Sequence, residues 1–150
     1  MHLGALIRPD LIFPDLPAAD RTGVLRALAE QIAGRGLVDD AGALFARLWE
    51  REQLGSTAVG GGIAIPHCKV DRLKSGIVAL GRVKEGVDFG AADGEPVRLF
   101  FLVVSPSQSP AEHLQILAAI SRWIRAGSRV RELLEQPDEK ALYDYLQREG

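Results

Sequence analysis

The sequence predicts an α/β or α+β fold in which helices cover the faces of a central sheet. The segment from Val97 to Val104 is almost entirely apolar after Arg98, which is typical of a central strand buried on both faces. Segments with helical periodicity precede and follow the middle of the chain, where short apolar runs are bounded by glycines. Elements of these two kinds bury their apolar surfaces against each other, so we expect a helix-covered sheet. These patterns leave the strand order open.

The length and composition suit one domain spanning residues 1–150. Hydrophobic residues make up 47% of the chain and charged residues 25%, the mix of an ordinary globular domain. The single cysteine, Cys68, excludes an internal disulfide and a multi-cysteine zinc site, and it fits a reducing compartment. A net charge of -2 without a basic cluster argues against nucleic acid as a partner.

The sequence contains neither a signal peptide nor a membrane-spanning segment by its pattern. Residues 1–16 carry scattered charges and prolines, unlike a secretory leader. The longest apolar run, Leu99 to Val104, is too short to cross a bilayer. We therefore expect a cytoplasmic protein with no direct membrane insertion.

Two helices are predicted in the first third of the chain. Asp20 is a candidate N-cap for the first, which Gly34 and Gly36 end. Asp39 or Asp40 opens the second, which stops near Gly55. The apolar positions expected on their buried faces are Val24, Leu25, Leu28 and Ile32 in the first helix, and Leu44, Phe45, Leu48 and Trp49 in the second.

The middle of the chain is predicted to contain short strands and glycine-rich loops. Gly60, Gly61 and Gly62 predict a loop rather than a regular element. The run Ile63 to Pro66 reads as a short strand with Pro66 near its end. Gly76 to Val83 predicts another strand, and Gly86 to Pro96 a loop that includes a short strand at Val87 to Phe89.

Three helices are predicted after the apolar strand. Ser109, Pro110 and Glu112 form a Ser-x-x-Glu capping box with proline at the first helical position, and this helix runs to about Ala126. Ser128 is expected to cap a short helix that Pro137 breaks. Asp138 opens the last helix.

Two histidines are the main candidates for chemistry. His67 follows the strand predicted at Ile63 to Pro66, so we place it at the carboxyl end of that strand, and His113 lies in the first turn of the Ser109 helix. Ligands gather outside the carboxyl ends of strands in open α/β sheets, so the two histidines meet if their strands are parallel neighbours. The helical face of His113 is otherwise apolar, which predicts a side chain that points inward. The simpler alternatives are a loop histidine at His67 and a core-edge histidine at His113.

Histidine is suited to carrying a phosphoryl group. Its unperturbed pKa is about 6.5, so most of it is the neutral nucleophile at cellular pH. One ring nitrogen attacks while the other holds the proton, and phosphoryl transfer then needs mainly alignment and charge stabilisation. The glycine-rich loop, together with the hydroxyls of Ser56 and Thr57, could supply that stabilisation. The loop could equally be a flexible connector.

Three further groups near His67 have competing interpretations. Arg51 could hold a phosphoryl oxygen or a partner's acidic groups, or it could be a solvated arginine paired with a glutamate. Cys68 adjoins His67, but adjacent residues of an extended chain point to opposite faces, so the two are poorly placed to act together. A metal site from His67, His113 and Glu112 lacks a recognised ligand spacing. We therefore predict no metal and no cofactor.

The stretch from Arg51 to His67 closely resembles the active-site signature of the fructose/mannitol-type IIA family of the bacterial sugar phosphotransferase system. In that family the histidine that closes the GIAIPH run is phosphorylated. The strand Val97 to Ser105 and the segment Glu112-His113-Leu114 resemble the second conserved region, and the tail from Asp138 to Tyr143 is similar as well. The resemblance thus covers almost the whole chain. One departure is Cys68, where family members often carry a smaller residue such as glycine.

The resemblance implies a mixed sheet packed between helices and a phosphohistidine intermediate at His67, formed through Nε2. His113 would help to hold the phosphoryl group, and Arg51, Ser56 and Thr57 map onto supporting positions. The phosphoryl donor would be a small histidine phosphocarrier, either HPr or its nitrogen-branch relative NPr. The chain would then be a phosphotransferase component that needs no cofactor.

Within the family the choice lies between regulation and transport. A chain of 150 residues leaves no room for a IIB or membrane domain, so it most resembles the nitrogen-type IIA regulators (PtsN-like), which bind targets according to their phosphorylation state. The first alternative is a free-standing IIA component for fructose- or mannitol-type uptake, which passes its phosphoryl group to a IIB cysteine. A binding module that has lost phosphorylation, and a hydrolase or metal-dependent enzyme, are the remaining alternatives.

Overall fold

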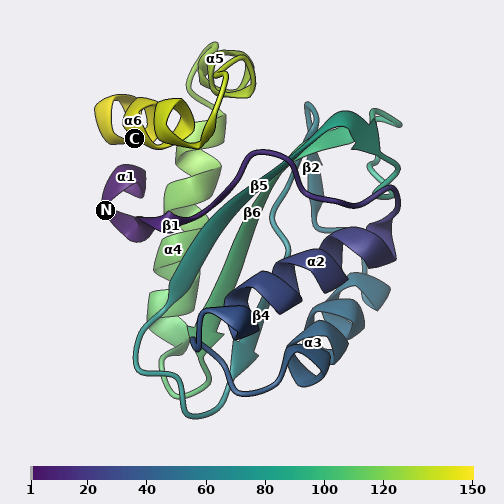
Figure 1. Cartoon of the computed structure of the whole chain (residues 1–150), viewed down its shortest axis with the longest axis vertical. Coiled ribbons are helices and arrows are strands. Elements are labelled where there is room, and N and C mark those ends of the chain that lie inside the picture. Colours follow the sequence, from purple (N-terminus) through teal and green to yellow (C-terminus); the bar gives the residue numbers. More distant parts are fainter. Residues whose placement is uncertain (1) are drawn as a thin grey trace.

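A mixed six-stranded sheet lies between two layers of helices (Figure 1), which confirms the predicted fold class. The computed structural model describes residues 2–150, so residue 1 of the predicted domain lies outside the described residues. The elements in chain order are α1 (Leu3–Leu6), β1 (Ile7–Phe13), α2 (Arg21–Gly34), α3 (Ala41–Gln53), β2 (Ala58–Gly60), β3 (Ile63–Ala64), β4 (His67–Val70), β5 (Ile77–Val87), β6 (Val97–Pro106), α4 (Pro110–Ile124), α5 (Arg129–Leu134) and α6 (Glu139–Glu149).

The strand order is β1-β5-β6-β3-β2, and β4 continues beside β6 past the end of β3. β1 runs parallel to β5, and β3 and β4 both run parallel to β6, whereas β5 and β6 are antiparallel. β6 is therefore the central strand predicted from its apolar sequence. Its residues alternate between the two sides: Phe100, Leu102 and Val104 pack on one side and Leu99, Phe101 and Val103 on the other.

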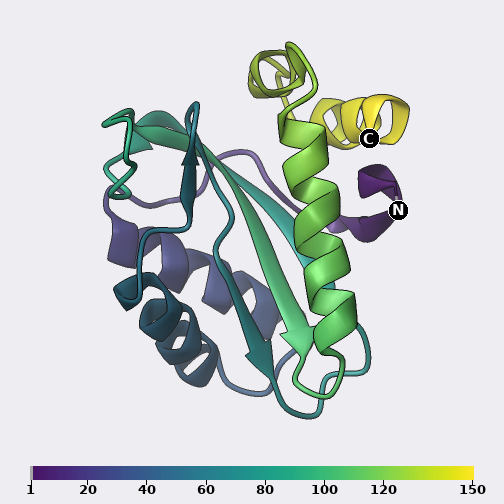
Figure 2. The same cartoon turned by 180° about the vertical axis from the view of Figure 1, so that it is seen from behind.

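Each face of the sheet has its own hydrophobic core. α2 and α3 cover one face, where Leu25, Leu28 and Leu48 are buried. α4 crosses the other face, and α1, α5 and α6 pack around its carboxyl-terminal half (Figure 2). Covering both faces explains why the middle strands can be apolar on both sides.

Three of the predicted helix starts are confirmed by side-chain caps. Asp20 accepts a hydrogen bond from the backbone N–H of Gly23, Asp40 from those of Gly42 and Ala43, and Asp138 from that of Ala141. A carboxylate at this position satisfies backbone donors that the first helical turn leaves free.

The two predicted serine caps are wrong in their hydrogen bonding. Ser109 and Ser128 stand at the N-cap positions of α4 and α5, but neither side chain caps the helix. The Glu112 carboxylate, which would complete the capping box, accepts instead from the backbone N–H of Gly76. The Ser128 hydroxyl donates to the carboxylate of Glu132. Long-range and side-chain partners thus compete successfully with the local cap.

The strand boundaries also differ from the prediction. β1 was not predicted, because Arg8, Pro9 and Asp10 interrupt its apolar pattern. β5 extends to Val87, which is the only residue of the short strand predicted at Val87 to Phe89 that is in a strand. The predicted strand Ile63 to Pro66 is regular only in β3, and Gly60 ends β2 rather than lying in a loop.

Candidate functional site

His67 is the first residue of β4, so its predicted place at the carboxyl end of a strand is wrong. The chain runs beside β6 through β3, leaves regular pairing at Ile65 and Pro66, and resumes it at His67, which pairs with Val103. Pro66 explains the interruption, because proline cannot donate a hydrogen bond to a neighbouring strand. The condition for the two histidines to meet holds, because this strand is a parallel neighbour of the Val97 strand. His67 thus lies partway along the sheet, between α3 and α4.

The imidazole of His67 has distinct partners at its two nitrogens. Nδ1 lies 2.7 Å from the carbonyl oxygen of Ile65, and Nε2 lies 3.2 Å from Nε of Arg51, which donates to it. A carbonyl can only accept, so Nδ1 carries the proton and Nε2 is the bare, nucleophilic nitrogen. Burial lowers the pKa of His67, and the positive charges of Arg51 and Lys69 lower it further, against the raising effect of the Ile65 carbonyl. The ring is therefore neutral at neutral pH.

Arg51 reaches the site from the last turn of α3. Its Nη1 donates to the carbonyl oxygen of Gly55 over 2.8 Å, while its Nε points at His67. The hydrogen bond to Gly55 holds the guanidinium in place beside His67. A fixed guanidinium here can offer planar donors to a phosphoryl oxygen.

His113 approaches the same ring from α4. The centroids of the two imidazoles are 5.4 Å apart and their planes are tilted by 54°, so the predicted meeting of the histidines is confirmed. The His113 side chain is buried, with its Nδ1 2.7 Å from Oγ of Ser105 on β6. Burial lowers the pKa of His113 to about 4, helped by the neighbouring His67 and Lys69. His113 is therefore also neutral near pH 7.

A hollow of about 410 Å³ opens in front of the two histidines. Two large apolar side chains stand on its rim, Leu54 with 81% and Leu114 with 66% of their surface exposed. Charged groups from α3 and β4 line it as well: Arg47, Glu50, Arg51 and Lys69.

The glycine turn does not take part in this site. Gly60, Gly61 and Gly62 all have positive φ. Gly60 ends β2, Gly61 and Gly62 join it to β3, and the N–H of Gly61 donates to Asp93. Ile63, at the end of the turn, is four pairs from His67 along β6, or about 13 Å at the usual rise of a strand. The expectation that its N–H groups stabilise a phosphoryl group on His67 is therefore wrong.

The hydroxyls of Ser56 and Thr57 are used for structure in this conformation. Oγ of Ser56 donates to the carbonyl oxygen of Phe89 over 2.5 Å. Oγ1 of Thr57 donates to the carboxylate of Glu52, which also accepts from the Thr57 N–H at 3.1 Å. Of the predicted site residues, the structure thus brings together His67, His113 and Arg51. The hydroxyls of Ser56 and Thr57 bind Phe89 and Glu52 instead.

Sequence reasoning missed Glu52 and Ser105. Glu52 is almost fully buried, and burial raises its pKa against the lowering effect of the Thr57 hydrogen bonds. Glu52, next to Arg51 in α3, binds Thr57 and so anchors the link between α3 and β2 that contains Gly55, the partner of Arg51. The strand alternation places Ser105 on the same side as Val103, facing α4, which was the one signal for its role.

The thiol of Cys68 is poorly reactive. Its side chain packs into the core beneath α2 and α3, whereas His67 faces His113 on the other side of the strand. Burial raises the pKa of the thiol to about 12, so a thiolate is not formed near neutral pH.

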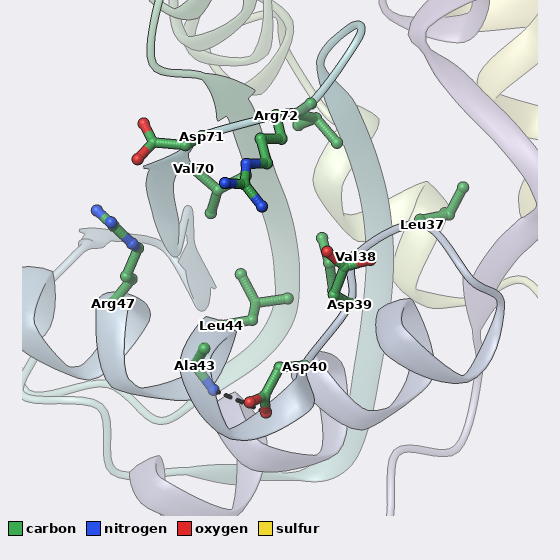
Figure 3. A pocket seen from close by; sticks show the side chains of 11 residues that line it. Leu37, Val38, Asp39, Asp40, Ala43, Leu44, Arg47, Val70, Asp71 and Arg72 are labelled. Carbon is green, nitrogen blue, oxygen red and sulfur yellow. Dashed lines mark hydrogen bonds between the residues drawn. The ribbon is translucent and has the colours of Figure 1, made fainter.

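A second hollow of about 210 Å³ adjoins the first at Arg47 (Figure 3). It lies between the loop before α3 and the turn after β4, where Arg72 has a positive φ of 64°. Its lining contains no histidine or cysteine, unlike that of the hollow at His67.

Residues 2–150 contain neither a candidate metal-binding cluster nor a membrane-spanning helix. No cluster of three or more histidine, cysteine, aspartate or glutamate side chains suited to a metal ion occurs among them. None of their helices combines the length and the apolar character needed to cross a bilayer.

Known proteins match the chain over nearly its full length. The fructose-specific EIIA component of Haloferax volcanii is 37% identical over 137 residues, covering 91% of this chain and 89% of the relative. A nitrogen regulatory protein of Bradyrhizobium diazoefficiens is 36% identical over 146 residues, covering 97% and 95%. The crystal structure of nitrogen regulatory protein IIA-Ntr from Neisseria meningitidis superposes with a TM-score of 0.87 at 27% identity, covering 96% of this chain and 98% of that one.

The family model described as "Phosphoenolpyruvate-dependent sugar phosphotransferase system, EIIA 2" matches residues 5–149. This range contains both histidines, Arg51 and every strand of the sheet. The chain therefore belongs to the EIIA type 2 family of the phosphoenolpyruvate-dependent sugar phosphotransferase system.

Proposed function

We propose that this chain carries a phosphoryl group on Nε2 of His67, receives it from a histidine phosphocarrier of the HPr or NPr type, and acts as a nitrogen-type regulatory IIA protein. The observation that carries the proposal is the hydrogen-bond pattern of His67. Its Nδ1 proton is held by the Ile65 carbonyl, and its Nε2 lone pair faces the Arg51 donor beside an open hollow.

The transfer step follows from this arrangement. The Nε2 lone pair attacks phosphorus, a new N–P bond forms, and the N–P bond to the phosphocarrier's histidine breaks with its electron pair returning to that ring. The Nδ1 proton of His67 stays in place throughout. No proton has to leave His67, because a neutral imidazole that gains a phosphoryl group at one nitrogen keeps its N–H at the other.

The charges around His67 favour the phosphorylated state. The phosphoryl group itself carries close to two negative charges at neutral pH. Arg51 lies within hydrogen-bond distance of the accepting nitrogen, and Arg47 and Lys69 line the same hollow. Arg51 can therefore exchange its contact with Nε2 for one with a phosphoryl oxygen.

The rim of the hollow supports a protein as the phosphoryl donor. Leu54 on the α3 side and Leu114 on the α4 side are both largely exposed and flank the histidines. A docked partner that covers them would gain apolar contact and would exclude water from the transfer.

The regulatory role is favoured by the full-length match to nitrogen regulatory proteins. Phosphorylation would place a doubly charged anion at the hollow, and with the Nδ1 proton retained the net charge of the side chain would fall by one unit, which is enough to alter which target binds there. The alternative of a sugar-transport IIA component, which hands its phosphoryl group to a IIB cysteine, is supported by the match to a fructose-specific EIIA component. An unphosphorylated binding module is disfavoured because His67, Arg51 and His113 remain assembled.

Intact mass spectrometry tests the carrier role. The protein is incubated with phosphoenolpyruvate, enzyme I and a histidine phosphocarrier, beside the variants His67→Ala and His2→Ala. We expect one acid-labile phosphoryl group on the wild type and on His2→Ala, whose histidine is exposed near the N-terminus, and none on His67→Ala. Absence of phosphorylation with several matched phosphocarriers would contradict the proposal and favour the binding module.

A second assay separates regulation from transport. The phosphorylated protein is mixed with a fructose-type IIB domain, and loss of the phosphoryl group to the IIB cysteine is followed by mass. Rapid and complete transfer would favour the transport role. Retention of the phosphoryl group, together with partner binding that depends on it, would favour regulation.

A further inference from the structure

We propose that Ser105 is a positioning residue that holds His113 in the tautomer with its proton on Nε2, so that this N–H is free to donate to a phosphoryl oxygen on His67. The inference rests on the proposed function for its second half only, because the tautomer is a property of the unphosphorylated protein. It assigns a role to a side chain that touches neither His67 nor the hollow.

Ser105 is completely buried near the end of β6. It pairs with Lys69 of β4, and the alternation of the strand turns its side chain to the face that α4 covers. There its Oγ lies 2.7 Å from Nδ1 of His113. Both partners are at most 5% exposed, so water does not compete with this hydrogen bond.

The direction of the hydrogen bond follows from the donors and acceptors at hand. A serine hydroxyl has one hydrogen to donate, and a buried donor without an acceptor is costly. The hydrogen bonds found among residues 2–150 give the Ser105 hydroxyl no acceptor other than Nδ1 of His113. If Nδ1 carried the proton, the serine hydrogen would have no partner. Ser105 therefore donates, and Nδ1 accepts.

The position of the remaining proton then follows from the charge of the ring. His113 is neutral near pH 7 because burial disfavours the charged form. A neutral imidazole that accepts at Nδ1 must carry its hydrogen on Nε2. Nε2 lies across the ring from Ser105, and the His113 side chain lines the hollow that it shares with His67.

This tautomer decides whether His113 helps or hinders the phosphorylated state. With hydrogen on Nε2, the ring offers a donor to the phosphoryl oxygens. In the other tautomer it would present a lone pair to the same oxygens, and the two would repel each other. A neutral donor also keeps this role over a wide pH range.

Long-range ¹H–¹⁵N NMR of the unphosphorylated protein reads the tautomer directly. We expect the His113 ring of the wild type to show a protonated Nε2 and a bare Nδ1. In Ser105→Ala we expect a mixture of tautomers. The control is Ser121→Ala, a serine on α4 like His113, and it should show the wild-type pattern. A wild-type ring protonated at Nδ1 would overturn the proposal, and that result does not depend on whether any variant folds.

The lifetime of the phosphohistidine tests the consequence. We expect Ser105→Ala to hydrolyse several-fold faster than the wild type, His113→Ala to do so at least as fast, and the double variant to be no faster than His113→Ala. An unchanged lifetime in a folded Ser105→Ala protein would overturn the link to the phosphoryl group. If His67 is never phosphorylated, the proposed function fails and this link fails with it, while the NMR result still decides the tautomer.

Discussion

Arg51 and His67 come from different layers of the fold and meet in one hydrogen bond, 3.2 Å from the guanidinium Nε to the imidazole Nε2. The donor of this bond thus rests on the atom that we propose as the phosphoryl acceptor. The resting contact therefore has to open as the phosphoryl group arrives, and the same guanidinium can then bind the incoming oxygens.

We expect Arg51→Lys to slow phosphoryl uptake by about 10-fold or more, because lysine keeps the charge but not the planar pair of donors. Arg51→Ala should be slower still. Initial rates by intact mass check this, with Arg47→Lys as the control, since Arg47 lines the same hollow without touching His67. Equal rates for Arg51→Lys and the wild type would show that the guanidinium has no role of its own in the transfer step.

The buried His113 should make stability fall in mildly acidic solution. Its pKa is lowered to about 4 in the folded protein, while the unfolded chain takes up this proton near pH 6.5. Between these values the unfolded state binds more protons, so the free energy of unfolding decreases as the pH falls, by about 3 kcal/mol in all from this group. Urea titrations from pH 7 to 4 should show a flatter dependence in His113→Gln. An equally steep dependence in this variant would place the effect elsewhere.

The Glu52–Thr57 contact should contribute substantially to stability. The Thr57 N–H and the Thr57 hydroxyl both donate to the Glu52 carboxylate. In Glu52→Gln one carboxylate oxygen becomes an amide N–H₂, which cannot accept, so one of these buried donors would lose its acceptor. We expect a loss of about 1–3 kcal/mol in the free energy of unfolding. The exposed Glu50→Gln is the matched control, with a change within about 0.5 kcal/mol. Slower phosphorylation of folded Glu52→Gln would show in addition that this contact positions Arg51.

Cys68 should resist alkylation in the native protein. Its thiol is buried and has a pKa raised to about 12, so little of the reactive thiolate exists at pH 8. Iodoacetamide labelling followed by mass should be slow in buffer and fast in denaturant. Cys68→Ala should still be phosphorylated on His67, and a loss of phosphorylation in this folded variant would show that the residue has a role in the site.

Local interactions account for the parts of the fold that could be predicted. Asp20, Asp40 and Asp138 cap helices through bonds that span two or three residues, and such contacts are visible in sequence. The capping box predicted at Ser109 does not form, because the Glu112 carboxylate accepts a hydrogen bond from Gly76, 36 residues away. β1 escaped prediction for a similar reason, since its pairing with β5 depends on a partner more than 60 residues along the chain.

The site shows the same division. Helical spacing and the order of the elements allowed His67 and His113 to meet on the condition that their strands are parallel neighbours, and the pairing of β3 with β6 meets that condition. The roles of Glu52 and Ser105 depend on which atoms meet across elements. Strand alternation indicates the face on which Ser105 lies, but not that its hydroxyl ends 2.7 Å from a ring nitrogen. The glycine turn was placed at the site from its position in the chain, although the pairing with β6 carries it away from His67.

The first and last helices lie side by side (Figure 1), and the Gln147 side chain donates to the carbonyl oxygen of Gly4 over 2.6 Å. They pack at the carboxyl-terminal end of α4, where Trp123 donates to the Glu149 carbonyl, whereas His113 lies ten residues earlier, about 15 Å along the helix. A tag, fluorophore or fused protein joined at either end would thus extend from the side of the molecule remote from the histidines. The domain is well suited to surface immobilisation and to circular permutation, with the hollow at His67 left open.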